Sequence, residues 1–303
     1  MRVGISIGST YPGDDHRAGP RQVIAEARAA AAAGLDTLSL GDHHASAPAS
    51  YVQNVPMLGR LLAEWDERPA GCLFLVPLWH PVLLAEQVGT LAAIGGGPFV
   101  LQAGLGAGKA QFAAMGASLA ERAARFEEAV ELIRALLAGE TVSSPTWGIE
   151  GAAIAPRPPA GVEWWVGGGV PRAIDRAARL GDCWYANADL TAPRAAELLA
   201  VYRDACARHG CEPLRIAIRK DVLVAERARD AEELGDALMA RGYRGFERGA
   251  VAYGDPDSVA EQLAPFAELG FTDVIIRTMS APADVAVRSV ALTGEVRARL
   301  LQA

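Results

Sequence analysis

Hydrophobic positions along the chain recur in a unit of one helix followed by one strand. In three stretches an Ala- or Leu-rich segment ends at a glycine, and a continuous hydrophobic run follows within a few residues. These stretches are residues 31–40, 178–186 and 267–276. Because glycine is the usual residue in the left-handed position after a helix, we expect three helices to end at Gly34, Gly181 and Gly270.

Five more hydrophobic runs bring the number of predicted strands to eight. They are residues 3–7, 71–76, 99–103, 163–166 and 215–224. The strands are too continuously apolar to face water on either side, which is typical of a parallel sheet covered by helices. In a chain of 303 residues, eight such units predict an α/β fold of the (β/α)8 TIM-barrel type. A doubly wound open sheet is the structural alternative.

Two segments are longer than the simple repeating unit needs. Residues 139–162, which include the Pro-rich run "APRPPAG", and residues 241–254 are predicted insertions over the C-terminal mouth of the barrel. Lids and substrate loops commonly lie in that position. The chain contains no low-complexity linker, so we expect residues 1–303 to form a single domain.

Composition excludes several classes of partner. The chain has 29 basic and 36 acidic residues, a net charge of -7 and no cluster of basic residues, so nucleic acid is not an expected partner. The apolar run at residues 70–85 is shorter than a membrane span and contains two prolines. Charges appear too early at the N-terminus for a signal peptide. With four cysteines in no paired motif, the sequence favours a cytoplasmic protein with reduced thiols.

A carboxylate and two histidines, Asp42, His43 and His44, directly follow the strand predicted near residues 36–40. In a barrel, the residues just after the carboxyl end of a strand line the active site. A carboxylate beside an imidazole orients the ring and raises its basicity, which suits proton transfer. Asp42 and His43 are therefore candidate catalytic residues. The structural alternative makes Asp42 a helix cap and His44 a surface residue.

A metal site is the competing chemical interpretation of the same segment. Successive side chains of an extended chain point to opposite sides, so His43 and His44 do not readily bind one ion together. The other histidines form no ligand motif with this pair. We predict no metal, and a metal-dependent barrel hydrolase that uses Asp42 and His43 is kept as an alternative.

Two glycine clusters follow the fourth and fifth predicted strands. They are "QAGLGAGKA" at residues 102–110 and "WVGGGVPRA" at residues 165–173. Glycines let backbone N–H groups approach an anion closely, and a helix N-terminus adds a positive dipole end, so the clusters together predict a phosphate cradle. The first cluster fits neither a Walker A loop nor a GxGxxG motif. Each cluster taken alone is equally compatible with a tight turn.

Four blocks of this sequence, in the same order, resemble the bacterial luciferase-like monooxygenase superfamily, whose members use reduced FMN or coenzyme F420. The first is "EARAAAAAGLDTLSLGDHH", which resembles the family's first helix and second strand. The others are the run from "GCLFLVPLWH" to "LQAGLGAG", the segment "WWVGGGVPRAIDRAARLGDCW" and the segment "GDPDSVAEQLAPFAELGFTDVIIR". The resemblance covers nearly the whole chain and implies the same barrel fold.

The resemblance implies roles for particular residues. His43 would be the active-site histidine near the reactive edge of the cofactor ring, with Asp42 orienting it or assisting protonation. Cys72 and Leu73 match a bulge in the third strand, often with a non-prolyl cis peptide bond, that supports the ring from behind. The residues expected to contact the cofactor's phosphate-bearing tail are Gly106, Ala107, Gly108, Gly168 and Gly169.

The resemblance also implies a flavin- or F420-dependent oxidoreductase that acts on a small organic substrate, and a homodimer. FMN would lead to monooxygenation, whereas F420 would lead to hydride transfer without oxygen. The Ala- and Arg-rich composition suggests a high-GC genome, where the deazaflavin branch is common, and it tilts the prediction slightly to F420. A non-catalytic flavin-binding barrel is a further alternative.

Overall fold

Eight parallel strands form a closed barrel in the computed structural model, which describes residues 1–11, 13 and 15–302. Each strand pairs with its neighbour in the ring, and the pairing of β10 with β11 closes it. The barrel strands are β1 (Arg2–Ile7), β3 (Leu38–Leu40), β5 (Ala70–Leu75), β6 (Phe99–Gly104), β9 (Val162–Gly167), β10 (Cys183–Ala186), β11 (Arg215–Val224) and β13 (Asp273–Thr278). The predicted TIM barrel is confirmed, and the open sheet is wrong because that closing pair leaves no edge.

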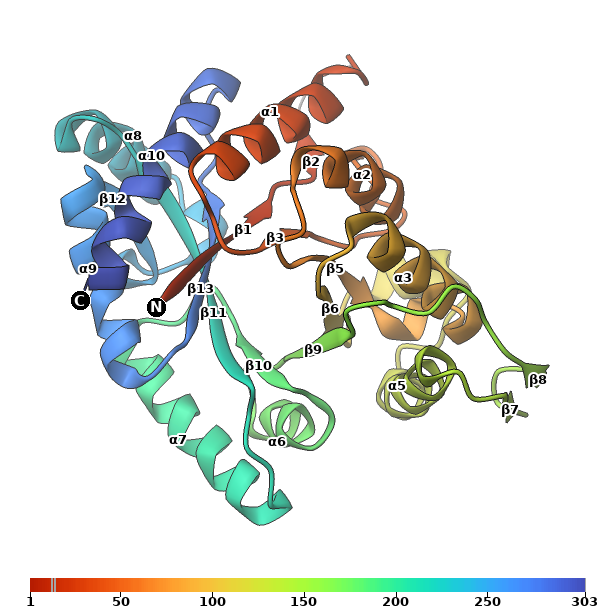
Figure 1. The fold of residues 1–303 in the computed structure, drawn as a ribbon. Coiled ribbons are helices and arrows are strands. Elements are labelled where there is room, and N and C mark those ends of the chain that lie inside the picture. The colour runs from red at the N-terminus through yellow and green to blue at the C-terminus, as the bar shows by residue number, and fades with distance from the viewer. Residues whose placement is uncertain (12, 14, 303) are drawn as a thin grey trace.

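Helices surround the strands on the outside (Figure 1). They are α1 (Ala18–Ala32), α2 (Asn54–Leu61), α3 (Pro81–Gly95), α4 (Lys109–Ala114), α5 (Arg122–Ala138), α6 (Pro171–Leu180), α7 (Ala192–His209), α8 (Ala228–Ala240), α9 (Pro256–Leu269) and α10 (Ala283–Gln302). Four short 3-10 turns accompany them, at Leu62–Glu64, Val76–Leu78, Tyr243–Gly245 and Arg248–Ala250. The short strands outside the ring are β2 (Thr10–Tyr11), β4 (Ser50–Tyr51), β7 (Val142–Ser144), β8 (Ile149–Ala152) and β12 (Val251–Gly254).

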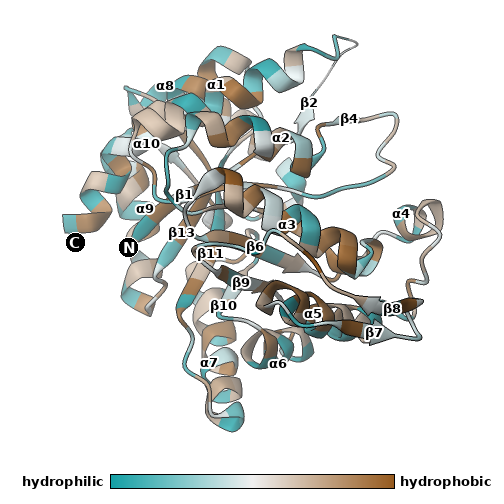
Figure 2. Cartoon of the chain, turned by 45° about the vertical axis from the view of Figure 1, so that its right-hand side comes forward, coloured by the Kyte–Doolittle hydropathy of each residue, from teal (hydrophilic) through white to brown (hydrophobic). Residues whose placement is uncertain are grey.

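Strand register divides the core into an inner and an outer layer. Side chains alternate along a strand, and parallel partners in register point to the same face. The inner layer contains Val100, Trp165, Cys183, Ala217 and Ile275, which are all fully buried inside the ring. The alternate positions face the helices and join the larger hydrophobic core (Figure 2), whereas several inward positions, such as Arg219 and Asp221 of β11, are charged.

Two of the three predicted glycine helix ends have the expected conformation. Gly34, with a φ of 70°, follows α1, and Gly270, with a φ of 103°, ends α9. The third prediction is wrong, because Gly181 at the end of α6 is extended, with a φ of -112°. A Cβ on Gly181 would lie 2.8 Å from the carbonyl oxygen of Ala177, so this glycine serves a close approach of backbones.

The two predicted insertions occupy different places. The first forms the β7–β8 hairpin, whose Trp147 lies under the guanidinium of Arg125 on α5, 3.7 Å from the ring centre. The hairpin therefore packs on the outside of the barrel and extends beyond α5 (Figure 1). It does not line the cavity at the mouth, because Trp147 packs against Arg125 at the start of α5 and His80 before α3, on the outside of the barrel. The second insertion reaches the mouth, where Tyr243 contacts Asp221 of β11.

In the part of the chain that the structure describes, no helix is both long and apolar enough to cross a membrane.

Candidate active site

The ends of β5, β6 and β9 form one half of the barrel mouth. The inward-facing positions there are Leu73 and Leu75 of β5, Gly104 of β6 and Gly167 of β9. A Cβ placed on Gly167 would have its nearest neighbours at 3.8 and 4.0 Å, both backbone oxygens, so the space above this position is open. Leu73, Gly104 and Gly167 are called the glycine floor below, and they give this half of the mouth an uncharged surface.

The opposite half of the mouth is charged. Arg219 and Asp221 lie on β11, Arg277 on β13 and Arg244 on the second insertion, and these four residues are called the arginine cluster. Asp221 is fully buried and accepts hydrogen bonds from Tyr243 Oη at 2.9 Å and Arg219 Nε at 3.2 Å. Arg244 Nε lies 3.6 Å from the same carboxylate. One carboxylate thus contacts two of the three guanidinium groups.

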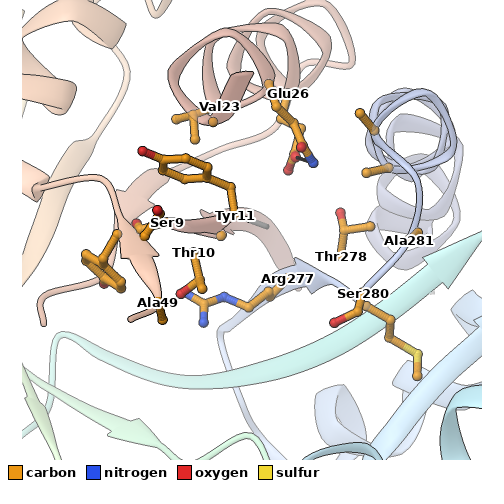
Figure 3. A pocket seen from close by; sticks show the side chains of 18 of the residues that line it. Ser9, Thr10, Tyr11, Val23, Glu26, Ala49, Arg277, Thr278, Ser280 and Ala281 are labelled. Atoms are coloured by element: carbon orange, nitrogen blue, oxygen red, sulfur yellow. Dashed lines mark hydrogen bonds between the residues drawn. The ribbon is translucent and has the colours of Figure 1, made fainter. Parts of the chain in front are cut away.

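A cavity of about 910 Å³ opens beside the arginine cluster. Its lining comes from within segments 8–11, 13–26, 48–51, 243–244 and 277–286. Figure 3 shows Tyr11 and Glu26 on one side of this space, Thr278 and Ser280 on another, and Arg277 projecting from β13 beneath Tyr11. Pockets of a few hundred to about a thousand Å³ are typical for small organic ligands. Sequence reasoning missed this cavity, although charged residues at the strand ends "IRKD" and "IIRT" were a usable signal.

Asp42 does not contact His43 in the way that the sequence predicts. Its carboxylate Oδ2 accepts a hydrogen bond from the Leu75 backbone N–H at 2.7 Å and another from Trp79 Nε1 at 2.8 Å. The other oxygen, Oδ1, lies 3.2 Å from Nε2 of His44, without hydrogen-bond alignment. The expectation that Asp42 orients His43 is therefore corrected: the buried carboxylate joins the end of β3 to the turn after β5, and the nearby imidazole is that of His44.

His43 nevertheless lies at the mouth. Its side chain is exposed, and its ring centre is 5.7 Å from that of Tyr51, which lines the cavity. Its backbone carbonyl accepts a hydrogen bond from Gln53 Nε2 at 3.1 Å, which holds the segment in place. The imidazole therefore borders the cavity through Tyr51, and water reaches it freely.

The two predicted glycine loops follow neighbouring strands, β6 and β9, and so lie at the same side of the mouth. Gly106 has a φ of 71°, and Ala107 and Gly108 after it are exposed. A Cβ on Gly168 would lie 2.8 Å from the carbonyl carbon of Ala173 at the start of α6. A Cβ on Gly169 would lie 2.4 Å from the Asn187 amide nitrogen, so a side chain there would displace Asn187, whereas at Gly168 it would collide with backbone. Backbone therefore forms the surface of both loops.

The third-strand prediction is partly wrong. β5 keeps an unbroken register with β6 from Ala70 to Leu75, so it has no bulge, and the bond between Cys72 and Leu73 is trans. Leu73 faces inward as part of the glycine floor, whereas Cys72 faces the helices and is fully buried. Burial raises the pKa of the Cys72 thiol well above its usual value. Its side chain is therefore a core residue, and support of a ring at this point falls to Leu73.

The residues that the structure describes contain no group suited to bind a metal ion. Among the described residues, no three His, Cys, Asp or Glu side chains are grouped so that they could hold one ion. Asp42 already accepts two hydrogen bonds on one oxygen and has only His44 beside the other. The geometry around Asp42 is thus that of a structural carboxylate.

Lys220 is a buried cation that lies outside the mouth. Its Nζ donates hydrogen bonds to the carbonyls of Leu190 at 2.7 Å and Ala188 at 3.3 Å, and it lies 4.8 Å from the ring centre of Phe266. Burial lowers its pKa to about 7. The side chain faces the helices, and it secures the loop after β10, which carries Asn187 beside Gly169.

The sequence matches the model of a known protein family over most of its length. Residues 1–251 match the family described as luciferase-like monooxygenase. The chain belongs to this family. The match includes β3 with Asp42, both glycine loops and β11.

Curated relatives of this luciferase-like protein use two different cofactors according to their names. An F420-dependent glucose-6-phosphate dehydrogenase of Beutenbergia cavernae is 32% identical over 187 residues, which cover 57% of this chain and 54% of the relative. An FMNH(2)-dependent dimethylsulfone monooxygenase of Pseudomonas fluorescens is 25% identical over 258 residues, covering 79% of this chain and 69% of the relative. The match thus spans only about half of the dehydrogenase's length.

Solved structures share the whole barrel. Monooxygenase RslO1 of Streptomyces bottropensis has a TM-score of 0.84 at 21% identity, covering 100% of this chain and 99% of that one. An F420-dependent secondary alcohol dehydrogenase in complex with an F420–acetone adduct has a TM-score of 0.79 at 15% identity, covering 99% of each chain. At such identities the likeness shows the luciferase-like fold alone.

Asp42→Ala is expected to lower the free energy of unfolding of this luciferase-like protein by about 1–3 kcal/mol, because it leaves the buried Leu75 N–H without an acceptor. Urea denaturation at neutral pH measures the change. Asp66→Ala, at an aspartate whose side chain is 87% exposed, is the matched control and should change the value by less than about 0.5 kcal/mol. Equal effects of the two substitutions would contradict the structural role.

Glu26→Gln is expected to raise the melting temperature at about pH 8. Burial of Glu26 beside the cavity raises the pKa of its carboxyl, although the hydrogen bond from Gln22 and the charge of Arg277 oppose this. A raised pKa in the folded state means that stability is complete below the unfolded pKa and declines as pH rises through the folded pKa. The gain of the variant should therefore shrink towards about pH 4. Glu140→Gln, at an exposed site, should show no such pH dependence, and a pH-independent gain for Glu26→Gln would refute the explanation.

Proposed function

We propose that this chain is an oxidoreductase that holds FMN or coenzyme F420 across the barrel mouth and acts on a small organic substrate in the adjacent cavity. The observation that carries the proposal is the division of the mouth into a glycine floor bordered by two backbone-lined loops and a charged half with a cavity of about 910 Å³. One half suits a planar ring with a phosphate-bearing tail, and the other half suits a substrate.

The residues present fit such a cofactor. The close approach of Gly168 to the Ala173 backbone is possible only without a Cβ, and α6 begins shortly after Gly169 with Pro171 at its first position. A helix N-terminus together with glycine N–H groups favours an anionic group. Gly106, Ala107 and Gly108 would border the same tail from the neighbouring strand. Leu73 would contact the ring face from the glycine floor.

A bound cofactor of this class supplies hydride transfer, or oxygen activation where it is FMN. The protein's own contribution is position and proton handling. His43 is the candidate for the proton step, because its exposed imidazole stands at the mouth beside Tyr51 and has no acidic partner of its own in the described residues. Asp42 acts indirectly, since it holds the segment after β3, which carries His43, against the turn after β5.

The choice between the two cofactors decides the reaction class. FMN would make the protein a monooxygenase, whereas F420 would make it a dehydrogenase or reductase. Names of similar proteins include both cofactors, and several of the more similar curated relatives are F420-dependent dehydrogenases. Together with the composition, this favours F420 in our proposal.

Anaerobic titration with FMN and with F420, each in both redox states, tests the proposal. We expect wild-type protein to bind one of them and Gly168→Asp to lose at least about tenfold in affinity, which is about 1.4 kcal/mol, because its side chain collides with the start of α6. Gly148→Asp, on the β7–β8 hairpin with open space around it, should bind as the wild type does. If wild-type protein binds neither cofactor, the proposed function is wrong.

His43→Ala is expected to abolish turnover while leaving the cofactor's dissociation constant within about twofold of wild type, since the residue lies beside the cavity and away from the glycine loops. Turnover is followed by cofactor absorbance against a panel of alcohols, aldehydes and sulfones, each with and without a carboxylate, phosphate or sulfonate group. Normal turnover by the variant would refute a proton-handling role. Absence of wild-type turnover on every substrate, with tight cofactor binding, would favour the non-catalytic barrel.

A further inference from the structure

Arg277 is a cation that forms no salt bridge with a described residue, although Asp221 and Glu26 lie close enough to interact with its charge. It lines the cavity, and its donors reach Ser6 only, with Nε 3.3 Å from the Ser6 carbonyl and Nη2 3.2 Å from its hydroxyl. No described carboxylate lies within 4.0 Å of its guanidinium. Guanidinium groups that leave bulk water are normally paired with an anion, because an unpaired buried charge is costly. Part of this donor fork is therefore available to a ligand.

The surroundings of Arg277 are positively charged rather than neutral. Burial lowers the pKa of Arg277. The positive charges of Arg219 and Arg244 also lower it, whereas the negative charge of Asp221 raises it. Asp221 is already engaged by Arg219 and by the hydroxyl of Tyr243. The arginine cluster thus holds three guanidinium groups around one carboxylate, and the uncompensated charge lies next to the cavity.

Backbone strain places one of these cations at the mouth. Arg244 has a φ of 50°, between Gly242 and Gly245 with φ values of 76° and 70°. Non-glycine residues in this region are strained and persist where the surroundings hold them, often at ligand sites. The strained turn directs Arg244 to Asp221 and to the cavity lining.

Neutral donors complete the cavity. The hydroxyl of Thr278 is buried and has no hydrogen-bond partner among the described residues, and Tyr11 and Tyr51 also line the space. Among the described residues that line the cavity, Glu26 is the one with an acidic side chain. Burial raises the pKa of its carboxyl. A group that offers several acceptor oxygens satisfies these donors better than an alcohol or a ketone does.

We infer that the substrate of this protein carries an oxyanion group, such as a carboxylate, phosphate or sulfonate, which Arg277 binds in the cavity with Arg244 assisting. This inference rests on the proposed function, because it assigns the substrate class of the same mouth. The anionic end lies against the arginine cluster, and the rest of the molecule extends towards His43 and the glycine floor. Arg277 is thus a binding residue that determines specificity.

Isothermal titration with ligands of equal chain length tests the inference without turnover. The probes are hexanoate, hexyl phosphate and hexanesulfonate, each compared with hexan-1-ol, with and without the cofactor that the wild type binds. We expect at least one oxyanion to bind wild-type protein about tenfold or more tightly than hexan-1-ol, as a charge-assisted pair predicts. The ranking among the three probes identifies the oxyanion. Equal affinity for all four probes would overturn the inference.

Arg277→Met should abolish this preference and leave the affinity for hexan-1-ol and for the cofactor unchanged. Arg229→Met, at an arginine whose side chain is 83% exposed on α8, is the matched control and should keep the preference. Arg277→Lys should keep only part of it, because lysine retains the charge but not the planar fork. If Arg277→Met does not fold, an undiminished preference in Arg277→Lys overturns the inference. Lack of cofactor binding would refute the proposed function while leaving the oxyanion preference measurable.

Discussion

The pairing of β10 with β11 is the constraint on which the rest of the structure depends. Four residues of β11, from Arg215 to Ile218, pair with β10 and close the ring, while the last four, from Asp221 to Val224, pair with β12 instead. The N-terminal half of β11 therefore completes the barrel, and its C-terminal half pairs with the additional strand β12. Because all eight barrel strands run in parallel, the closed ring brings their carboxyl ends to one mouth.

Closure also explains why the mouth has two unlike halves. On the side of β5, β6 and β9, glycines at inward positions leave backbone exposed, and two glycine loops continue the same surface. On the side of β11 and β13, inward positions carry Asp221 and Arg277, and the second insertion adds Tyr243 and Arg244. An uncharged half and a charged cavity thus share one mouth, which is the arrangement that our proposed redox function requires.

Asp42 shows how a residue can be found correctly and interpreted wrongly. Its place after a strand is as expected, but side chains alternate, so Gly41 faces the mouth while Asp42 faces the turn after β5, where it binds Leu75 N–H and Trp79. Buried carboxylates that accept several hydrogen bonds are structural anchors as often as they are catalytic groups. The adjacent His43 again faces the mouth, so the two neighbours have different tasks.

The sequence by itself determined the strand–helix repeat, the barrel and the positions of the glycine loops, because hydrophobic periodicity and glycine placement are local properties. It also predicted that residues 42–44 end a strand at the mouth. Only the tertiary structure decided which side chains meet. Arg277 and Asp221 lie 56 positions apart along the chain, yet they are direct register partners on the neighbouring strands β13 and β11. The cavity and the partner of Asp42 depend on such long-range register, and no local pattern in the chain encodes it.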